Sequence, residues 1–196
     1  MWRQKLTFVR SFVRWSIRFT AVHRERWKDG KCSIVCASRN NHGLTHLIFS
    51  SFFLFSLFIF SFTIVVAEAP NGNLMGYVLG KAEGDDKLWH GHVSAVTVAP
   101  SYRRLGLAKT LMDEFETVCV HTYNAYFVDL FVRASNHLAQ RMYEKFGYST
   151  YRRVLGYYAG EAPEDALDMR KALPRDVTKE SVIPLDHPVL PEQLEW

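Results

Sequence analysis

One short stretch of the chain has the residue types of an anion-binding turn. Residues 96–108 read Val-Thr-Val-Ala-Pro-Ser-Tyr-Arg-Arg-Leu-Gly-Leu-Ala, so a strand pattern gives way to a helix pattern. The first amide groups of a helix lack intrahelical partners, and the helix dipole favours an anion in front of them. Gly106 and Ala108 carry little or no side chain, while Arg103 and Arg104 add positive charge. The pattern fits a pyrophosphate site, and an ordinary strand-turn-helix connection with solvated arginines fits it equally well.

The elements that would position this turn follow from the hydrophobic periodicity. Apolar residues recur every four positions from Leu107 to Cys119, which predicts an amphipathic helix. A nearly continuous apolar segment at Tyr126–Val132 predicts a strand that is buried on both faces. Further strands are expected at residues 65–69, 74–83, 92–99, 152–158 and 166–171, and a second helix is expected to stop at Gly147. The order β-β-β-α-β-α-β-β predicts an α/β fold with a mixed central sheet flanked by helices.

The charge of the chain is concentrated near its start. Residues 1–46 hold ten Lys or Arg and two acidic residues, whereas the whole chain has a net charge of +4. The high isoelectric point therefore describes this basic segment and not the later part, so it does not predict nucleic-acid binding. Residues 174–196 contain four prolines and are expected to form an extended tail.

The three cysteines do not indicate a metal centre. Cys32 and Cys36 are not followed by a second pair of ligands at zinc spacing, and Cys119 lies on the apolar side of the expected helix. We expect inert thiols in a reducing compartment and no metal.

Residues 47–67 contain no charged side chain. The length would let a helix span a bilayer, so a membrane segment is one interpretation. From Phe49 to Phe62, however, every residue except Ile59 is Phe, Ser or Leu. These amino acids share codons made of pyrimidines, so a translated intron or misplaced gene start is a second interpretation. A buried core helix is a third.

Beyond residue 64 the sequence resembles a known family. The turn at residues 96–108 is similar to the acetyl-CoA signature of the GNAT acetyltransferases. Within that family, ordered segments resemble the catalytic subunits of the NatB amino-terminal acetyltransferases: Val66–Pro70, Leu74–Tyr77, Trp89–Val93, Phe127–Arg133, Met142-Tyr143, Gly147-Tyr148, Tyr157-Tyr158 and Asp168–Leu173. The resemblance covers about residues 65–192, and we recognise no such similarity upstream. It implies a GNAT domain at residues 65–173 with an atypical amino-terminal extension.

The resemblance assigns roles to individual residues. It implies that acetyl-CoA is bound by Val96, Val98, Arg103, Arg104, Gly106, Leu107, Ala108 and Asn136. Tyr143 would protonate the departing thiolate or contact the CoA sulfur, although it could equally be a core residue, and Asn136 could simply cap its helix. His92 is a candidate base or peptide ligand. Tyr157 and Tyr158 would flank the substrate, one of them in the core.

The implied activity is acetyl transfer from acetyl-CoA to protein amino termini that begin with Met followed by Asp, Glu, Asn or Gln. The implied partners are the auxiliary helical-repeat subunit of NatB and nascent chains at the ribosome, in the cytoplasm. A membrane would be involved only if residues 47–67 form a genuine segment. The alternatives are a GNAT-like binding subunit that lacks the peptide-gripping elements, and a membrane-anchored acetyltransferase.

Overall fold

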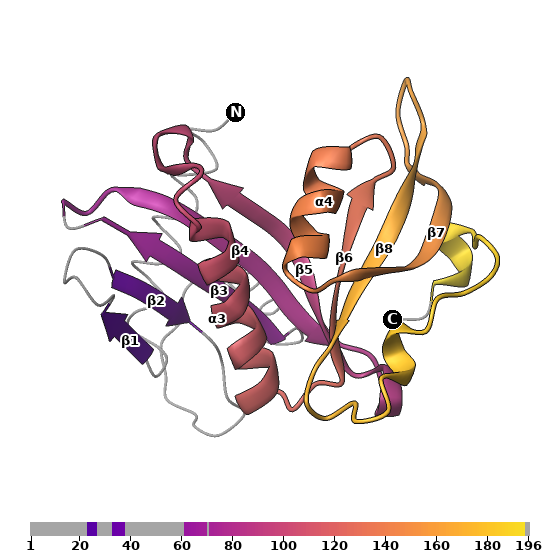
Figure 1. The fold of residues 1–196 in the computed structure, drawn as a ribbon, viewed down its shortest axis with the longest axis horizontal. Helices are drawn as coiled ribbons and strands as arrows, with labels where there is room; N and C mark the ends of the chain where they lie inside the picture. Colours follow the sequence, from indigo (N-terminus) through magenta and orange to yellow (C-terminus); the bar gives the residue numbers. More distant parts are fainter. Residues whose placement is uncertain (1–22, 27–32, 38–60, 70, 195–196) are drawn as a thin grey trace, which may run out of the picture. The chain divides into compact units, whose positions relative to one another are not determined.

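The computed structural model describes residues 23–26, 33–37, 61–69 and 71–194 (Figure 1). The chain forms two compact units. The first joins the residues up to Lys81 with Ala95–Val118, and the second joins Ala82–Ser94 with the residues from Cys119 onward. Strands β4 (Leu74–Glu83) and β5 (His90–Val98) contribute to both units because the boundaries fall within them.

The sheet of the first unit runs in the order β1-β2-β3-β4-β5. Its first three strands are β1 (His23–Arg26), β2 (Ser33–Ala37) and β3 (Ser61–Glu68). These strands pair antiparallel, and the register of β2 with β3 runs from Ser33 opposite Glu68 to Ala37 opposite Ile64. The sequence predicted that the first strand begins at Val65. The structure starts it at Ser61 and adds two short strands beside it.

The charge-free segment at residues 47–67 lies partly within this unit. Residues 47–60 lie outside the described part of the chain, so the three interpretations stay open for them. Residues 61–67 form most of β3, so the expectation of a membrane or core helix is wrong for this end of the segment. Aromatic and β-branched residues such as Phe62, Thr63 and Ile64 fit a strand better than a helix. Among the helices that the structure describes, none is both long and apolar enough to cross a membrane.

The expected hairpin between β3 and β4 is confirmed. The Ala69 amide donates to the Asn73 carbonyl at 2.8 Å, and the Gly72 amide donates to the Ala69 carbonyl at 2.9 Å. Asn71 accepts from the Asn73 amide at 3.1 Å. The strands on either side bury a cluster formed by Ile64, Val66, Leu74 and Tyr77.

Helix α3 (Leu107–His121) confirms the helix predicted from the apolar stripe. Leu111 and Phe115 are fully buried. The helix comes very close to β4 at Gly76, where an added Cβ would lie 2.7 Å from the Thr97 oxygen and 3.2 Å from Leu111 Cδ1. The contact with Thr97 is too short for any side chain and involves the backbone of β5, so the close approach of β4 to β5 requires glycine here, and the tighter fit against Leu111 adds to that requirement.

The sheet of the second unit runs in the order β5-β6-β8-β7. Its further strands are β6 (Phe127–Arg133), β7 (Ser149–Tyr158) and β8 (Glu164–Ala172). β5 and β6 are parallel, whereas β8 pairs antiparallel with both β6 and β7. The sheet is therefore mixed, as predicted. The parallel register ends at Val93 opposite Leu130, although β5 continues to Val98.

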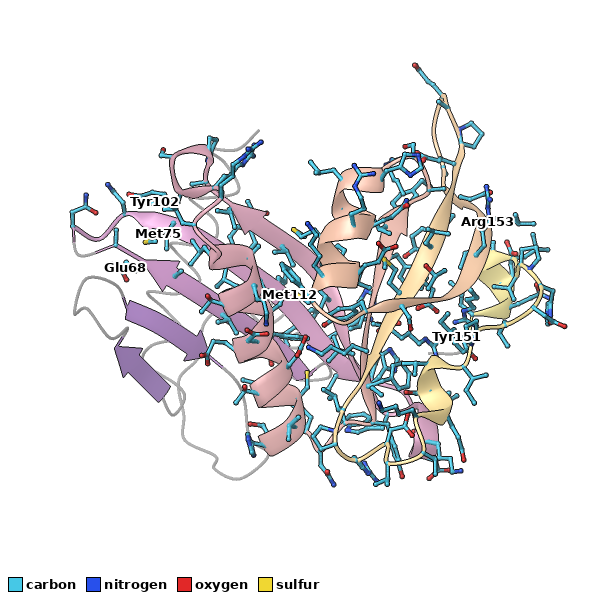
Figure 2. All side chains as sticks on the ribbon, in the orientation of Figure 1. Glu68, Met75, Tyr102, Met112, Tyr151 and Arg153 are labelled. Carbon is cyan, nitrogen blue, oxygen red and sulfur yellow. The ribbon has the colours of Figure 1, made fainter. Side chains whose placement is uncertain are left out.

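Helix α4 (His137–Lys145) follows β6 and ends two residues before Gly147. The carboxy-terminal segment lies along the edge of β7. Leu185 donates to the Tyr151 carbonyl at 2.8 Å, and Val189 donates to the Arg153 carbonyl at 2.9 Å. Tyr151 and Arg153 are labelled on β7 in Figure 2. The expected extended tail thus covers an edge strand that would otherwise expose unpaired backbone groups.

A buried ion cluster joins β7 and β8. Asp168 is fully buried and accepts from Arg152 Nε at 2.9 Å and from Arg170 Nη2 at 3.1 Å. The Arg170 guanidinium also lies 3.6 Å from the ring centroid of Tyr151. Both arginines are almost completely buried, so the pairing with Asp168 is what makes their burial tolerable.

Candidate active site

The turn between β5 and α3, where the sequence predicts an anion site, belongs to the first unit. Arg104 and Gly106 both have positive φ, at 61° and 78°. The Nε of Arg103 donates to the Val98 carbonyl at 3.3 Å, so this guanidinium also ties the turn to the end of the strand. Val96, like Val98, is half-buried on β5.

The start of α3 offers the amides that an anion would need. The helix begins at Leu107, whose side chain is buried, and the Thr110 amide donates back to the Gly106 carbonyl at 3.2 Å. An added Cβ at Gly106 would meet no atom within 4 Å. The open space over Gly106 and the small side chain of Ala108 let a phosphate approach the first-turn amides.

The second unit brings His92 and Asp129 together. The two residues are directly opposite each other in the parallel register of β5 and β6. His92 Nδ1 lies 2.9 Å from Asp129 Oδ1, and both side chains are largely buried. The ring of His92 is also tilted against the ring of Phe131, with centroids 5.7 Å apart.

His90 lies two residues before His92, so it points to the same side of β5. Its ring stacks on Phe127 with centroids 4.8 Å apart, and its Nδ1 lies 2.6 Å from the Leu88 carbonyl oxygen. Its Nε2 faces Asp129 Oδ1 at 3.6 Å and has no hydrogen-bond partner among the described residues.

The charge of Asp129 is set by these neighbours. Burial by itself would raise the pKa of Asp129, because it penalises the charged carboxylate. His90, the hydrogen bond from His92 and the charge of Arg170 together hold that pKa below its ordinary value. Asp129 therefore remains a carboxylate at neutral pH.

Glu83, His90 and His92 also form a set of potential metal ligands, with donor atoms within 4.8 Å of one another. A tetrahedral zinc ion with ligands at about 2.0–2.2 Å would hold its ligand atoms roughly 3.3–3.5 Å apart. The distance from His90 Nε2 to Glu83 Oε1 is 4.0 Å. The set would have to contract to hold zinc, so the expectation of no metal stays a prediction.

Tyr143 lies on α4 among other aromatic side chains. Its ring makes edge contacts with Phe146 and Tyr148, at centroid distances of 6.2 and 5.9 Å. Burial, followed by the influence of Tyr158, raises the pKa of Tyr143 to about 12. The phenol is therefore protonated throughout the neutral range and is available as a proton donor.

Tyr157 and Tyr158 are both half-buried. The ring of Tyr157 stacks on Phe131, whereas the hydroxyl of Tyr158 donates to the Phe131 carbonyl at 3.2 Å. The Arg133 guanidinium covers the ring of Tyr158 at 4.1 Å. Both tyrosines therefore contact Phe131 of β6, and the Phe131 ring contacts the rings of both Tyr157 and His92.

Asn136 caps α4, because its Oδ1 accepts from the Ala139 amide at 3.1 Å. This structural role was one of the two expected for it. The side chain is exposed, and its amide nitrogen is not used in the cap. A role toward a ligand stays a prediction.

The structure therefore groups some of the predicted residues. Val96, Val98, Arg103, Arg104, Gly106, Leu107 and Ala108 belong to the first unit, whereas His92, Asn136, Tyr143, Tyr157 and Tyr158 belong to the second. The sequence interpretation missed Asp129 and Phe131. Asp129 carried a signal, because it is the only charged residue within the apolar strand at Tyr126–Val132.

Comparisons with known proteins identify the family of the chain. The sequence profile described as the acetyltransferase (GNAT) family matches residues 46–148, so the match begins upstream of Val65. The chain is 57% identical over 148 residues to N-alpha-acetyltransferase 20 of Dictyostelium discoideum, covering 76% of this chain and 84% of that protein. It is 61% identical over 131 residues to the N-terminal acetyltransferase B complex catalytic subunit NAA20 of Arabidopsis thaliana, covering 67% of this chain and 74% of that protein.

Solved structures give the same result. A NatB acetyltransferase complex bound to a bisubstrate inhibitor matches with a TM-score of 0.60 and 38% identity, over 80% of this chain and 90% of that chain. Chaetomium thermophilum Naa20 in complex with a bisubstrate analogue also matches with a TM-score of 0.60, at 35% identity, over 88% and 98% of the two chains. The predicted GNAT fold and the resemblance to NatB catalytic subunits are confirmed.

Proposed function

This chain belongs to the GNAT acetyltransferase family and is an acetyl-CoA-dependent amino-terminal acetyltransferase, and we propose that it acts as the catalytic subunit of a NatB-type enzyme. Its substrates would be protein amino termini that begin with Met followed by Asp, Glu, Asn or Gln. The open, glycine-containing start of α3 at residues 103–108, within a chain this similar to NatB subunits, is the observation that carries the proposal.

The reaction needs little from the protein beyond positioning and proton transfer. A neutral α-amine attacks the thioester carbonyl, a carbon–nitrogen bond forms, and the carbon–sulfur bond breaks to release CoA. The amine loses one proton and the departing sulfur gains one. Because free α-amines have a pKa of about 7.7–8.0, a useful neutral fraction exists near pH 7, and a modest base is sufficient.

Two parts of the first unit would bind acetyl-CoA. The amides at the start of α3, with Arg103 and Arg104, would hold the pyrophosphate. Backbone amides near Val96 and Val98 would hold the acetyl carbonyl and the negative charge that develops on it. Both valines lie on the part of β5 that extends past its register with β6.

Residues of the second unit would handle protons and the peptide. His92 would accept the proton of the α-amine, directly or through water, and Tyr143 would give a proton to the leaving sulfur. Tyr157 and Tyr158 would line the peptide site, and the free amide nitrogen of Asn136 would hydrogen-bond the pantetheine arm. A chain that bound acetyl-CoA without transferring it would not need this set of proton-transfer groups.

Partners and location follow from the same proposal. Relatives at this level of identity are named as subunits of a NatB complex, so we propose an auxiliary subunit as the stable partner. Nascent chains at the ribosome, in the cytoplasm, would then be the substrates.

The test is acetyl transfer by the full-length chain, alone and co-expressed with a NatB auxiliary subunit. CoA release would be measured with peptides that differ only at their start: Met-Asp, Met-Leu and Ser-Asp. We expect the Met-Asp peptide to react at least tenfold faster than the other two. Acetyl-CoA binding without transfer to any of them would contradict the proposal and favour a binding subunit.

A further inference from the structure

Asp129 and His92 form a buried pair whose chemistry goes beyond holding two strands together. Asp129 lies opposite His92 in the register of β5 and β6, and its Oδ1 is 2.9 Å from His92 Nδ1. Only 3% of Asp129 is exposed, so it cannot exchange this partner for solvent. A position directly across a parallel ladder also leaves the carboxylate little freedom to reorient.

The pair determines which nitrogen of His92 carries a proton. Asp129 is ionised, and an ionised carboxylate can only accept hydrogen bonds. His92 Nδ1 must therefore be the donor. In a neutral imidazole the other nitrogen, Nε2, then has the lone pair. We propose that Asp129 is a positioning residue of the acetyl-transfer reaction, which fixes His92 in the tautomer whose Nε2 can accept the proton of the substrate amine.

Charged and titratable groups surround this pair on every neighbouring strand. Glu83 on β4 and His90 on β5 lie on one side, whereas Asp168 and Arg170 on β8 and Tyr157 on β7 lie on the other. Asp129 and Glu83 both raise the pKa of the Tyr157 hydroxyl, after burial as the largest cause. Tyr157 is thus kept protonated and does not compete with His92 for a proton.

His90 supports the charge of Asp129. Its Nδ1 is engaged by the Leu88 carbonyl, which can only accept, so Nδ1 carries a hydrogen. Its Nε2 faces Asp129 Oδ1 at 3.6 Å without a hydrogen-bond partner among the described residues. His90 is one of the neighbours that lower the pKa of Asp129, so it helps to keep the carboxylate ionised as the acceptor for His92.

This inference rests on the proposed function, and a double-mutant cycle separates the two. Full-length parent, Asp129→Asn, His92→Gln and the double variant would be compared in acetylation of the Met-Asp peptide. We expect Asp129→Asn to lower kcat at least tenfold, up to the loss of about 10²–10⁴-fold that removal of a general base causes. The effects of the two substitutions on kcat should be strongly non-additive, because the side chain at position 129 acts only through His92. Additive losses would assign Asp129 to the fold alone and overturn the proposal.

The pH profile of kcat gives a readout that packing would not move. An anion beside an imidazole favours the protonated form of the imidazole, so removing the anion should shift the acid limb of the profile toward lower pH. The substrate amine contributes to this limb equally in every variant, so the informative quantity is the difference between the limbs of the parent and Asp129→Asn. No difference between them would contradict the role of His92. The partly buried Asp165, which pairs with the exposed Arg153 on the same sheet, provides a control: Asp165→Asn should leave the profile unchanged.

A spectroscopic measurement needs no variant and no activity. Nitrogen NMR of ¹⁵N-histidine-labelled parent protein distinguishes the two neutral tautomers, with His92→Gln for assignment. We expect His92 to carry its proton on Nδ1, and a proton on Nε2 would overturn the inference even if Asp129→Asn fails to fold. A parent that shows this tautomer but acetylates no peptide would contradict the proposed function, and with it the role of Asp129 in the reaction.

Discussion

The rings of Tyr157 and Tyr158, consecutive residues of β7, are nearly perpendicular, with centroids 5.1 Å apart. Consecutive residues of a regular strand point to opposite faces. β7 is irregular here, because its register with β8 shifts between Val154 and Tyr158. The irregularity brings both rings to Phe131, which Tyr157 stacks on and whose carbonyl accepts from Tyr158.

Replacing Tyr157 by alanine should weaken peptide binding and leave acetyl-CoA binding unchanged. The ring is only half-buried, so its exposed part is available to a substrate. We expect the KM for the Met-Asp peptide to rise at least tenfold, with the Kd of acetyl-CoA from calorimetry within about twofold of the parent. Tyr157→Phe keeps the stack on Phe131 and should recover most of the affinity. Equal KM values for parent and Tyr157→Ala would exclude Tyr157 from the peptide site.

Acetyl-CoA binding should depend on the charge placed at Gly106. Both Gly106→Glu and Gly106→Gln would force a side chain into a backbone with φ of 78°, at a cost of about 1–2 kcal/mol. Only glutamate adds a negative charge where the phosphate would lie. We therefore expect similar Tm values for the two variants but a Kd at least tenfold higher for Gly106→Glu. If the two variants bind acetyl-CoA equally, the start of α3 is not the phosphate site.

Tyr143→Phe should reduce turnover and spare binding. The change removes the proton donor but keeps the ring contacts with Phe146 and Tyr148. We expect kcat to fall by about 10²–10⁴-fold, while the Kd of acetyl-CoA changes little. Tyr148→Phe alters a neighbouring buried phenol and should leave kcat near the parent value. A kcat for Tyr143→Phe within twofold of the parent would make Tyr143 a packing residue.

The pH dependence of kcat tests the same proton-donor role of Tyr143. The donor form of Tyr143 exists below its pKa, which burial raises to about 12, so it is lost only as the pH approaches that value. We expect the kcat of the parent to rise with amine deprotonation and then stay level to pH 10. A fall by half near pH 10, the ordinary pKa of tyrosine, would mean that the essential donor is a phenol in a solvated environment.

Local sequence patterns predicted the main elements because the spacing of apolar residues within a segment shows which of its faces is buried. The stripe from Leu107 to Cys119 became α3, and the apolar segment at Tyr126–Val132 became β6 almost to the residue. The position of the turn at residues 103–108 was predictable for the same reason, because it lies where a strand pattern gives way to a helix pattern; its phosphate-binding role stays a prediction.

The rest depended on how distant strands pair. Nothing near His92 indicates that Asp129, on another strand, lies opposite it, because the register is set by the whole sheet. The irregularity of β7 and the pairing of Arg152 with Asp168 could not be predicted from the local sequence for the same reason. The pairing of β2 with β3 was missed because the Phe-rich segment before Val65 masked the start of β3.

Removal of metal should not affect the reaction. The donor atoms of Glu83, His90 and His92 are too widely spaced for zinc without movement, and acetyl transfer to an amine can proceed with the protein groups alone. Activity after dialysis against EDTA should therefore equal that before dialysis. Added zinc should inhibit only through this set of donors, so Glu83→Gln, which removes one donor but no proposed catalytic group, provides the control. A loss of activity with EDTA that zinc restores would show that this cluster is a metal site.

Asp168→Asn should destabilise the fold more than any change at the exposed ion pairs. Asp168 is fully buried and accepts hydrogen bonds from Arg152 and Arg170, so the asparagine would remove the carboxylate that both buried guanidinium groups share. Arg170 would keep the charge of Asp129 as a neighbour, whereas Arg152 would lose its paired anion. Breaking one partner of a buried pair typically costs about 3–5 kcal/mol, because the remaining charge cannot regain water. We expect the unfolding free energy from urea titration to fall by about that amount.

The control for this prediction is Asp165→Asn, which breaks a more accessible ion pair on the same strand, β8. Asp165 accepts from Arg153 at 2.7 Å, but the Arg153 side chain is 56% exposed, so water replaces the lost partner. Its urea midpoint should stay close to that of the parent. The variant Arg152→Met tests the cause, because it removes one of the two buried cations instead of the anion that they share. If Arg152→Met restores stability to the Asp168→Asn background, the loss came from uncompensated buried charge and not from lost packing; no recovery would assign it to packing.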